Sequence, residues 1–383
     1  MKDFQLRNDT KLLFRNDPAK DLQELTAGKK ALFVYGGGSV KRNGCYDDVK
    51  NAITKSGGTL YEAGGSSRER KDIETGIRIA KENQVDLIVG AGGASVMDCA
   101  KLIAFGVCHT EDLWDFVKGK APCGHTLMPG KTGNNREKNP YGLEKLPLIL
   151  MPTYPSSGSE YGLGAVSVDT QADDFGTAYG IAADYAVLVP KYSLSLGQEM
   201  TAYTGLVTLV QLSASTIGDK NPVSYDIGIS VIRNVLKATR RLKEHPDDLD
   251  ARGVILYGAS IATSGRLGIG KEENYSYDIY EVEFIPEALF GASYRKSLTT
   301  LFPRFLKAMA AYHEEEIRAY FRDAFGYEGD VDGSAAKLVA LFEELGIDMY
   351  FEGDADETRI CQIPIDSVLD QDEVIRIIRE SMQ

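Results

Sequence analysis

The sequence predicts an α/β domain built on a parallel sheet, followed by an all-helical domain. In the first half, short apolar runs alternate with amphipathic helical segments, which is typical of a parallel sheet covered by helices on both faces. After Pro190 the strand-like runs stop and helical periodicity continues to the C-terminus. We therefore predict two domains, residues 1–190 and residues 191–383.

The individual elements follow from where apolar runs and turn-forming residues fall. Short apolar runs bounded by turn residues predict strands, and apolar residues at helical spacing predict helices. In the first domain we expect strands at 4–6, 12–14, 31–35, 59–62, 85–90, 148–151, 165–168 and 186–189, and helices at 21–27, 46–56, 68–83 and 95–102. In the second domain we expect helices at 200–217, 226–244, 249–267, 297–311, 314–325, 335–345 and 372–382.

Residues 119–146 interrupt this alternation. They contain several Gly, Pro, Asn and Lys residues and little apolar periodicity, so we predict an irregular loop. Long loops of this kind are either lids over a site or surface insertions, and the sequence leaves both interpretations open.

The composition limits which kinds of partner the protein can bind and in which cellular compartment we expect it. The 383 residues carry a net charge of −13, which argues against general binding to nucleic acid or to anionic membranes. No apolar run approaches the roughly 20 residues that span a bilayer, and the charged first segment does not resemble a signal peptide. The cysteines lack a CxxC pair, so we expect reduced thiols in a cytoplasmic protein. They are Cys45, Cys99, Cys108, Cys123 and Cys361.

One strand-to-helix turn has the features of an anion site. The apolar run at 85–90 leads through small residues at 91–94 to Ser95, which we expect to cap the following helix. The first N–H groups of a helix lack partners and its dipole favours negative charge, while Gly92 and Gly93 allow a pyrophosphate to approach the backbone. The alternative is a tight turn with no ligand, because a glycine-rich turn alone is weak evidence.

Three segments carry a resemblance to a known family. Residues 90–101 resemble the GGGSxxDxAK motif of the iron-containing alcohol dehydrogenases, and residues 31–49 resemble their butanol-dehydrogenase branch. Residues 152–160 resemble the family's third nucleotide-side motif, and all three occur in the family's order. The resemblance implies the dehydroquinate-synthase-like, iron-alcohol-dehydrogenase fold, with a Rossmann-like first domain. It also implies an NAD(P)H-dependent alcohol or aldehyde oxidoreductase with hydride transfer between the domains.

These segments supply the candidate cofactor-binding residues. The strand at 31–35 ends in glycines and Ser39 rather than in the carboxylate that usually binds the ribose 2′-hydroxyl of NAD, and Lys41 and Arg42 follow. We therefore expect NADP(H) to be preferred over NAD(H), unless these two cations are merely solvated. The candidates are Gly36, Gly37, Gly38, Ser39, Lys41, Gly92, Gly93, Ala94, Ser95, Asp98, Thr153, Ser156, Ser157 and Ser159.

The second domain departs from the family at its metal site. The resemblance implies an Asp and a His on one helix and two further His ligands, and these positions fall on Val207, Gln211, Tyr280 and Tyr294. Such residues do not form a site for a catalytic divalent ion, so we expect no iron or zinc there. None of the four histidines, His109, His125, His245 and His313, replaces a ligand. A substitute site could come from the acidic residues Glu272, Glu273, Asp278, Glu281, Glu283 and Glu287, which otherwise form a solvated face.

Three functions remain open at this point. The first is the oxidoreductase that the resemblance implies, and the second is a metal-independent or very weak enzyme in which Tyr280, or else Tyr294, donates a proton. In that region the tyrosines could instead fill the vacated metal cavity. The third is a catalytically silent NADP-binding protein that acts through a partner. A small alcohol or aldehyde is the expected substrate, and the resemblance implies a homodimer formed through the N-terminal strand edge.

Overall fold

The computed structural model describes residues 2–110, 112–118, 143–172, 174–218, 221–271, 275–363, 365 and 367–383. Its first half is built on a six-stranded sheet with the order β1-β8-β5-β4-β2-β3. Every strand pairing in this sheet is parallel. The strands are β1 (Lys11–Phe14), β2 (Lys30–Tyr35), β3 (Thr59–Gly64), β4 (Leu87–Gly92), β5 (Leu148–Pro152) and β8 (Tyr185–Leu188).

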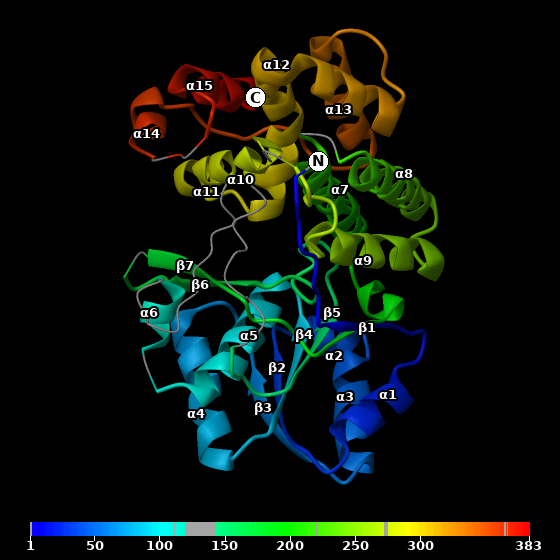
Figure 1. Cartoon of the computed structure of the whole chain (residues 1–383), viewed down its shortest axis with the longest axis vertical. Coiled ribbons are helices and arrows are strands. Elements are labelled where there is room, and N and C mark those ends of the chain that lie inside the picture. The colour runs from blue at the N-terminus through cyan, green and yellow to red at the C-terminus, as the bar shows by residue number, and fades with distance from the viewer. Residues whose placement is uncertain are drawn as a thin grey trace.

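Helices cover both faces of this sheet (Figure 1). The helices are α1 (Ala19–Thr26), α2 (Ser39–Arg42), α3 (Cys45–Lys55), α4 (Arg70–Asn83), α5 (Ala94–Cys108) and α6 (Leu113–Val117). Apolar side chains of α1 and α3 form one core, and those of α4 and α5 form another on the opposite face. Since α3 follows β2 and α5 follows β4, the chain changes face between these neighbouring strands. Ligands of open α/β sheets bind at such a switch point.

A separate two-stranded antiparallel sheet is formed by β6 (Gly164–Asp169) and β7 (Asp174–Tyr179). The sequence predicted β6 but missed β7. Most residues of β7 are half-buried or exposed, so the strand has no clear apolar pattern. This hairpin is joined to the start of α4, because the backbone N–H of Val168 donates to the carbonyl oxygen of Arg68 at 2.9 Å.

The second half is helical and has its own apolar core, as predicted. Its α-helices are α7 (Gln198–Thr216), α8 (Pro222–Glu244), α9 (Leu249–Thr263), α10 (Ile279–Val282), α11 (Phe284–Phe290), α12 (Tyr294–Phe325), α13 (Val331–Glu344), α14 (Glu357–Gln362) and α15 (Gln371–Glu380). Two short 3-10 helices, η1 (Pro190–Ser193) and η2 (Tyr275–Asp278), accompany them. Non-helical angles at His313 divide α12 where the sequence predicted two separate helices.

The N-terminal segment differs from the prediction. Residues 2–10 form no strand, so the strand expected at 4–6 was wrong. The segment leaves the sheet edge and reaches the helical half, where the N–H of Lys2 donates to the carbonyl oxygen of Gly270 at 3.0 Å (Figure 1). A strand at 4–6 would therefore have no neighbour to pair with. Most of the predicted loop at 119–146, namely 119–142, lies outside the described residues.

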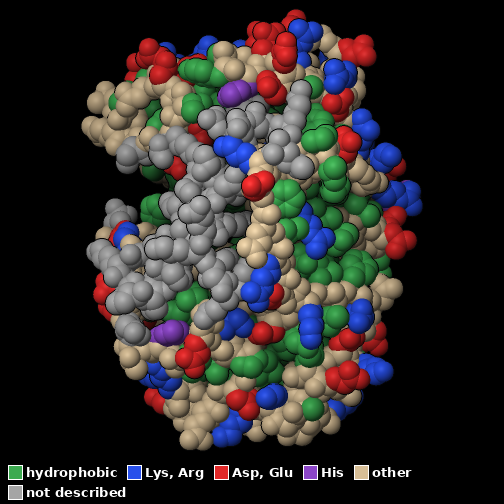
Figure 2. All heavy atoms as spheres, viewed as in Figure 1, with side chains coloured by type: hydrophobic (Ala, Val, Ile, Leu, Met, Phe, Trp, Pro, Cys, Tyr) green, Lys and Arg blue, Asp and Glu red, His purple; other side chains and the backbone are tan. Residues whose placement is uncertain are grey.

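The described surface is mixed in charge. Acidic and basic side chains are interspersed over the face shown in Figure 2. In the part of the chain that the structure describes, no helix combines the length and apolar character needed to cross a bilayer.

Candidate functional site

The predicted nucleotide loops lie on one rim, at the carboxyl ends of the parallel strands. Gly36, Gly37 and Gly38 follow β2, and Gly93 follows β4, the neighbouring strand. Gly37 and Gly38 are exposed, and Gly93 is half-buried. The β3–α4 loop joins the same rim, because the N–H of Ser66 donates to the carbonyl oxygen of Tyr35 at 3.0 Å. The rim therefore presents backbone from three adjacent strand ends.

The start of α5 is the candidate anion-binding feature of this rim. The helix begins at Ala94 with Gly93 as its N-cap, and no side chain caps it. Ser95 lies inside the first turn, so the prediction that it caps the helix was wrong. The first N–H groups of α5 remain available to a ligand, as at other phosphate-binding helix starts. A Cβ at Gly92 would lie 2.8 Å from Val96, which explains the glycine by close strand–helix packing.

The segment at 152–160, which contains the candidate serines, is bonded to the end of β4 and to α5. The N–H of Thr153 donates to the carbonyl oxygen of Gly92 at 2.9 Å. The Ser159 hydroxyl donates to Asp98 Oδ1 at 2.6 Å, and the N–H of Val166 donates to Asp98 Oδ2 at 3.1 Å. Burial raises the pKa of Asp98. Asp98 and Ser159 thus bind each other, while Ser157 is half-buried and Ser156 is buried.

A second buried charge fixes the same segment. Lys101 is fully buried, and its Nζ donates to the carbonyl oxygens of Gly162 at 2.9 Å and Gly164 at 2.7 Å. Burial lowers the pKa of Lys101 to about 8. Glu160 is also buried and accepts a 2.6 Å hydrogen bond from Ser260 on α9. These contacts were not predicted from the sequence, although a charged residue inside the apolar α5 helix was a visible signal.

Lys41 lies in a cluster of aromatic and acidic side chains that was not predicted from the sequence. Its Nζ is 4.9 Å from the centre of the Tyr46 ring and 5.5 Å from that of Tyr35. Both phenols donate to Glu62 on β3, at 2.6 Å from Tyr35 and 2.8 Å from Tyr46. These hydrogen bonds and the charge of Lys41 lower the pKa of Glu62. A carboxylate therefore lies near the cation that we assigned to the 2′-phosphate.

The four family metal positions are occupied by apolar, amide and phenol side chains that lie close together. Val207 is buried on α7, and Gln211 Nε2, one turn later, donates to the Tyr294 hydroxyl at 3.2 Å. Tyr280 is half-buried on α10. Its ring lies 5.6 Å from that of Tyr277, whose hydroxyl is 2.9 Å from Ser215 Oγ. Burial raises the pKa of both Tyr280 and Tyr294, so both phenols stay protonated near neutral pH.

The predicted acidic alternative finds no support among the described residues. Glu272 and Glu273 lie outside them. Asp278 accepts from Ser367 Oγ and from the N–H of Val368, both at 2.8 Å, and Glu283 is buried. Within the described ranges, no group of three or more His, Cys, Asp or Glu side chains is arranged to hold a metal ion. His125 also lies outside the described residues.

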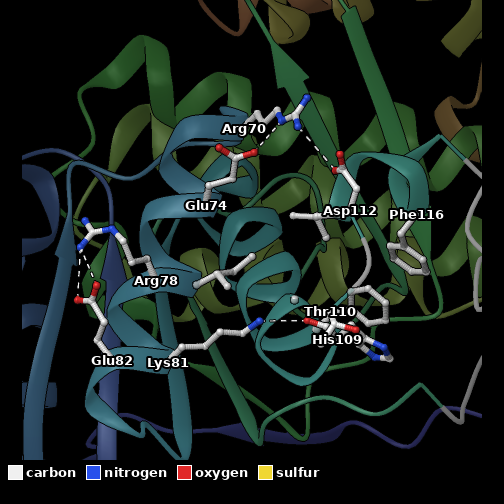
Figure 3. Close-up of a pocket in the computed structure, with 13 residues that line it drawn as sticks. Arg70, Glu74, Arg78, Lys81, Glu82, His109, Thr110, Asp112 and Phe116 are labelled. Atoms are coloured by element: carbon white, nitrogen blue, oxygen red, sulfur yellow. Dashed lines mark hydrogen bonds and ion pairs between the residues drawn. The ribbon is translucent and has the colours of Figure 1, made fainter.

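A hollow of about 640 Å³ lies between α4, the end of α5 and α6 (Figure 3). It is at the opposite end of α5 from the rim, about 20 Å away for a helix of 15 residues. The basic side chains along it have partners: Arg70 contacts Glu74, Arg78 contacts Glu82, and Lys81 donates to the carbonyl oxygen of His109. The hollow therefore takes no part in the site at the rim.

Comparison with known proteins agrees with the family resemblance that the sequence motifs carry. The family profile described as iron-containing alcohol dehydrogenase matches residues 9–194. The chain is 26% identical over 365 residues to the probable NADH-dependent butanol dehydrogenase 1 of Bacillus subtilis (strain 168), covering 90% of this chain and 88% of that protein. It is 26% identical over 363 residues to the NADPH-dependent aldehyde reductase YqhD of Escherichia coli (strain K12), covering 91% and 88%.

A solved structure extends the likeness over the whole fold. The NADH-dependent butanol dehydrogenase A of Thermotoga maritima superposes with a TM-score of 0.85 at 23% identity, covering 100% of this chain and 99% of that one. Together with the profile match and the two relatives, this agrees with the three rim segments and the helical second half. The chain therefore resembles the iron-containing alcohol dehydrogenase family, through the profile over residues 9–194 and through the two relatives over 90% and 91% of its length.

Proposed function

We propose that the chain is an NADP(H)-dependent oxidoreductase that interconverts small aldehydes and alcohols without the metal ion of its family. The reaction takes place where the rim meets the helical half, a region that we call the junction. The two halves contact each other beside the segment at 152–160, where Thr263 Oγ1 donates to the Gly158 carbonyl oxygen at 2.7 Å. They also meet at the β6–β7 hairpin, since the Phe175 ring on β7 stacks on Phe284 of α11 with ring centres 5.5 Å apart. The names of the relatives support nicotinamide-dependent alcohol or aldehyde chemistry.

The observation that supports this proposal is that the rim loops and the start of α5 have the features of a dinucleotide site. Exposed glycines after β2, the uncapped start of α5 after β4 and the fixed segment at 152–160 lie on the strand ends. The bound cofactor supplies the hydride. In this arrangement Asp98 and Ser159 position the third segment rather than contact the nucleotide, and Lys41 favours the 2′-phosphate.

The donor set at the family metal position does not fit a divalent ion. Val207 has no donor atom, Gln211 offers a neutral amide, and burial keeps Tyr280 and Tyr294 protonated. We propose instead that the Tyr280–Tyr294 pair supplies the proton, with Tyr280 first. Tyr280 would donate its phenol proton to the carbonyl oxygen as the carbonyl carbon takes up the hydride that the reduced cofactor would supply, which leaves the oxidised cofactor, and a proton from solvent would then restore the phenol.

Losing a Lewis acid removes several kcal/mol of transition-state stabilisation. We therefore expect this chain to turn over more slowly than metal-dependent members of the family. The test measures metal content and NADPH oxidation with a panel of aldehydes, before and after exhaustive chelation. We expect little iron or zinc and slow turnover that chelation leaves unchanged. Near-stoichiometric iron or zinc with brisk, chelator-sensitive turnover would contradict the proposal. NADPH binding without turnover on any aldehyde would instead favour a silent nucleotide-binding protein.

We also propose that residues 1–190 and 191–383 are separate domains and that the chain is a homodimer. The described strands end before Pro190, and the helical half has its own core. β1 is the edge of the sheet and pairs only with β8 among the described strands, which leaves an edge open to a second copy. Light scattering should give twice the chain mass, and a concentration-independent monomer would exclude the dimer.

A further inference from the structure

We propose that the junction accepts aldehydes that carry a carboxylate, and that the guanidinium of Arg68 binds this group. The inference rests on the proposed oxidoreductase function and deepens it by naming the substrate class. It follows from the position of one arginine, from its lack of a partner and from the groups around it.

Arg68 is fixed on the rim by its backbone. It lies in the short loop between β3 and α4, and this loop is bonded to the end of β2 through Ser66. Its carbonyl oxygen accepts from the N–H of Val168 at 2.9 Å and from Ser167 Oγ at 3.2 Å. The half-buried side chain thus starts from a rigid position beside the nucleotide loops.

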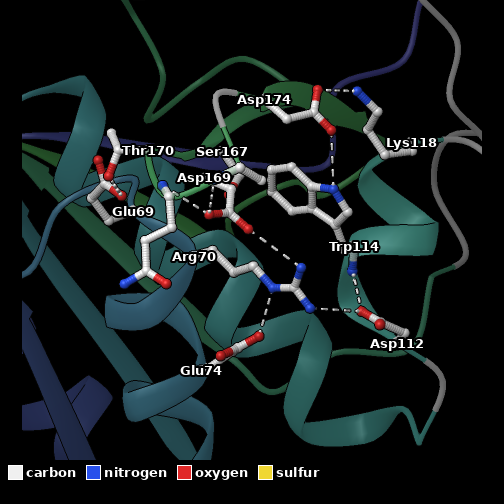
Figure 4. Close-up of polar contacts among 12 residues, drawn as sticks. Glu69, Arg70, Glu74, Asp112, Trp114, Lys118, Ser167, Asp169, Thr170 and Asp174 are labelled. Atoms are coloured by element: carbon white, nitrogen blue, oxygen red, sulfur yellow. Dashed lines mark hydrogen bonds and ion pairs between the residues drawn. The ribbon is translucent and has the colours of Figure 1, made fainter.

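The guanidinium of Arg68 has no ion pair or side-chain hydrogen bond with any described residue. Arg70, two positions later, shows the contrast (Figure 4). Its guanidinium contacts Glu74 at 2.7 Å, Asp169 at 3.4 Å and Asp112 at 3.7 Å. A partly buried cation without a counter-ion is unfavourable, so the position of Arg68 calls for an anion supplied from outside the chain.

The groups that feel the charge of Arg68 come from both halves of the protein. Its positive charge acts on Asp98 beneath the rim and on Glu283 and Tyr294 of the helical half. Asp98 is already bonded to Ser159 and Val166. The charge of Arg68 therefore reaches Tyr294, one of the two phenols that we assign to proton transfer, and we assign its anion to the substrate rather than to the nucleotide.

Glu283 does not neutralise this cation. Its side chain is 2% exposed, and its Oε2 atom has no hydrogen-bond partner among the described residues. Burial and the neighbouring Glu287 raise its pKa well above the ordinary value, which favours the neutral acid. A neutral acid leaves the charge of Arg68 available and offers a further hydrogen bond to a bound oxygen. A planar guanidinium suits a carboxylate, which it binds through two parallel hydrogen bonds.

The first experiment compares succinic semialdehyde with butanal, which have the same four-carbon chain and differ in a terminal carboxylate. With saturating NADPH, we expect wild-type kcat/KM to favour succinic semialdehyde. R68Q should reduce this preference about tenfold to hundredfold, the value of a charge-assisted hydrogen bond. R68K should retain part of it. R70Q is the matched control and should keep the wild-type preference, because the Arg70 guanidinium already contacts Glu74, Asp112 and Asp169.

The second experiment does not depend on turnover. Calorimetry measures 4-hydroxybutyrate and 1-butanol binding to the NADPH complex of wild type and R68Q. We expect 4-hydroxybutyrate to bind more tightly than 1-butanol in wild type only. If this holds while no aldehyde is reduced, the proposed reaction fails and the anion site stands. Equal binding of the two alcohols by wild type, or an R68Q defect in NADPH binding alone, would overturn the inference about Arg68.

Discussion

Gln211 Nε2 on α7 donates to the hydroxyl of Tyr294 on α12 at 3.2 Å. The bond joins two positions at which the family resemblance implies metal ligands. Because the phenol oxygen accepts this bond, its own proton is available to another acceptor. Gln211 Oε1 is buried with no partner among the described residues, so the amide leaves an acceptor atom in this region. In our proposal this hydrogen bond orients the Tyr294 phenol for proton transfer rather than for ligation.

Replacing Tyr280 by Phe removes a phenol while keeping the ring. Proton transfer by a positioned side chain typically contributes a hundredfold or more, so we expect Y280F to lower kcat/KM by about a hundredfold. Y294F should have a smaller effect in the same direction. NADPH binding should be unchanged in both, since neither phenol has a hydrogen bond to the rim loops within the described residues. Steady-state kinetics with one aldehyde and calorimetry with NADPH measure the two quantities.

Tyr277 provides the control for this pair. Its ring lies beside Tyr280, but its hydroxyl is occupied by Ser215 Oγ at 2.9 Å. Y277F should therefore keep most of the activity. A loss in Y277F as large as that in Y280F would show that packing of the aromatic cluster, rather than proton donation, governs the rate.

Lys41 and Glu62 have opposite charges near the proposed 2′-phosphate position, so their variants should shift cofactor preference in opposite directions. K41Q removes a cation, and we expect the NADPH-to-NADH ratio of kcat/KM to fall about tenfold. E62Q removes a neighbouring negative charge that repels the phosphate, so the ratio should rise. At high salt the NADPH-to-NADH ratios of K41Q and E62Q should differ less from each other, because salt screens the charges of these partly solvated groups. A K41Q ratio equal to that of wild type would place the 2′-phosphate elsewhere.

The sheet was largely predictable because its central strands are apolar along their whole length. The residues at 31–35, 87–89 and 148–151 are buried on both faces, which gives continuous apolar runs. The short helices α10 and α11 were not predicted, since they contain Glu and Pro286 and each spans at most two turns. Their position depends on packing against α12 rather than on local pattern.

The candidate site also has parts that the sequence predicts and parts that it does not. The glycine turns at 36–38 and 92–93 were found because tight strand-to-helix turns require small residues that are adjacent in sequence. Glu62 and Glu160 were missed, because their partners lie up to 100 positions away along the chain. Arg68 was missed for a related reason: its significance is the lack of a partner in the described structure, and no sequence pattern shows this.

Lys101 should give the protein an alkaline increase in stability. Its pKa is about 8 in the folded chain against an ordinary value of 10.5. Between these values the unfolded chain holds a proton that the folded chain has lost, so the free energy of unfolding rises with pH. The full contribution corresponds to roughly 3 kcal/mol. Denaturant unfolding across this pH range, compared with K101Q, should show the rise in wild type only.

An exposed lysine controls for general alkaline effects. Lys20 is 89% exposed on α1, so K20Q should follow wild type at every pH. If K101Q also follows wild type, then Lys101 keeps an ordinary pKa and the buried contacts to Gly162 and Gly164 fully stabilise its charge.

Gly158 should tolerate substitution far less well than another glycine of the same conformation. Its φ of +63° lies in the left-handed region, and a Cβ there would lie 2.2 Å from the Ala259 carbonyl oxygen and 2.4 Å from Thr263 Oγ1. Gly28 has a similar φ of +68°, but a Cβ would meet nothing within 4 Å. We expect G28A to lower the free energy of unfolding by about 1–2 kcal/mol, the backbone cost alone. G158A should cost about 3 kcal/mol or more, because overpacking adds to that cost. G158A should also weaken NADPH binding, since the loop with Ser156 and Ser157 would be displaced from α9. Denaturant unfolding and calorimetry of both variants test this, and equal losses would show that the segment at 152–160 is not held against α9.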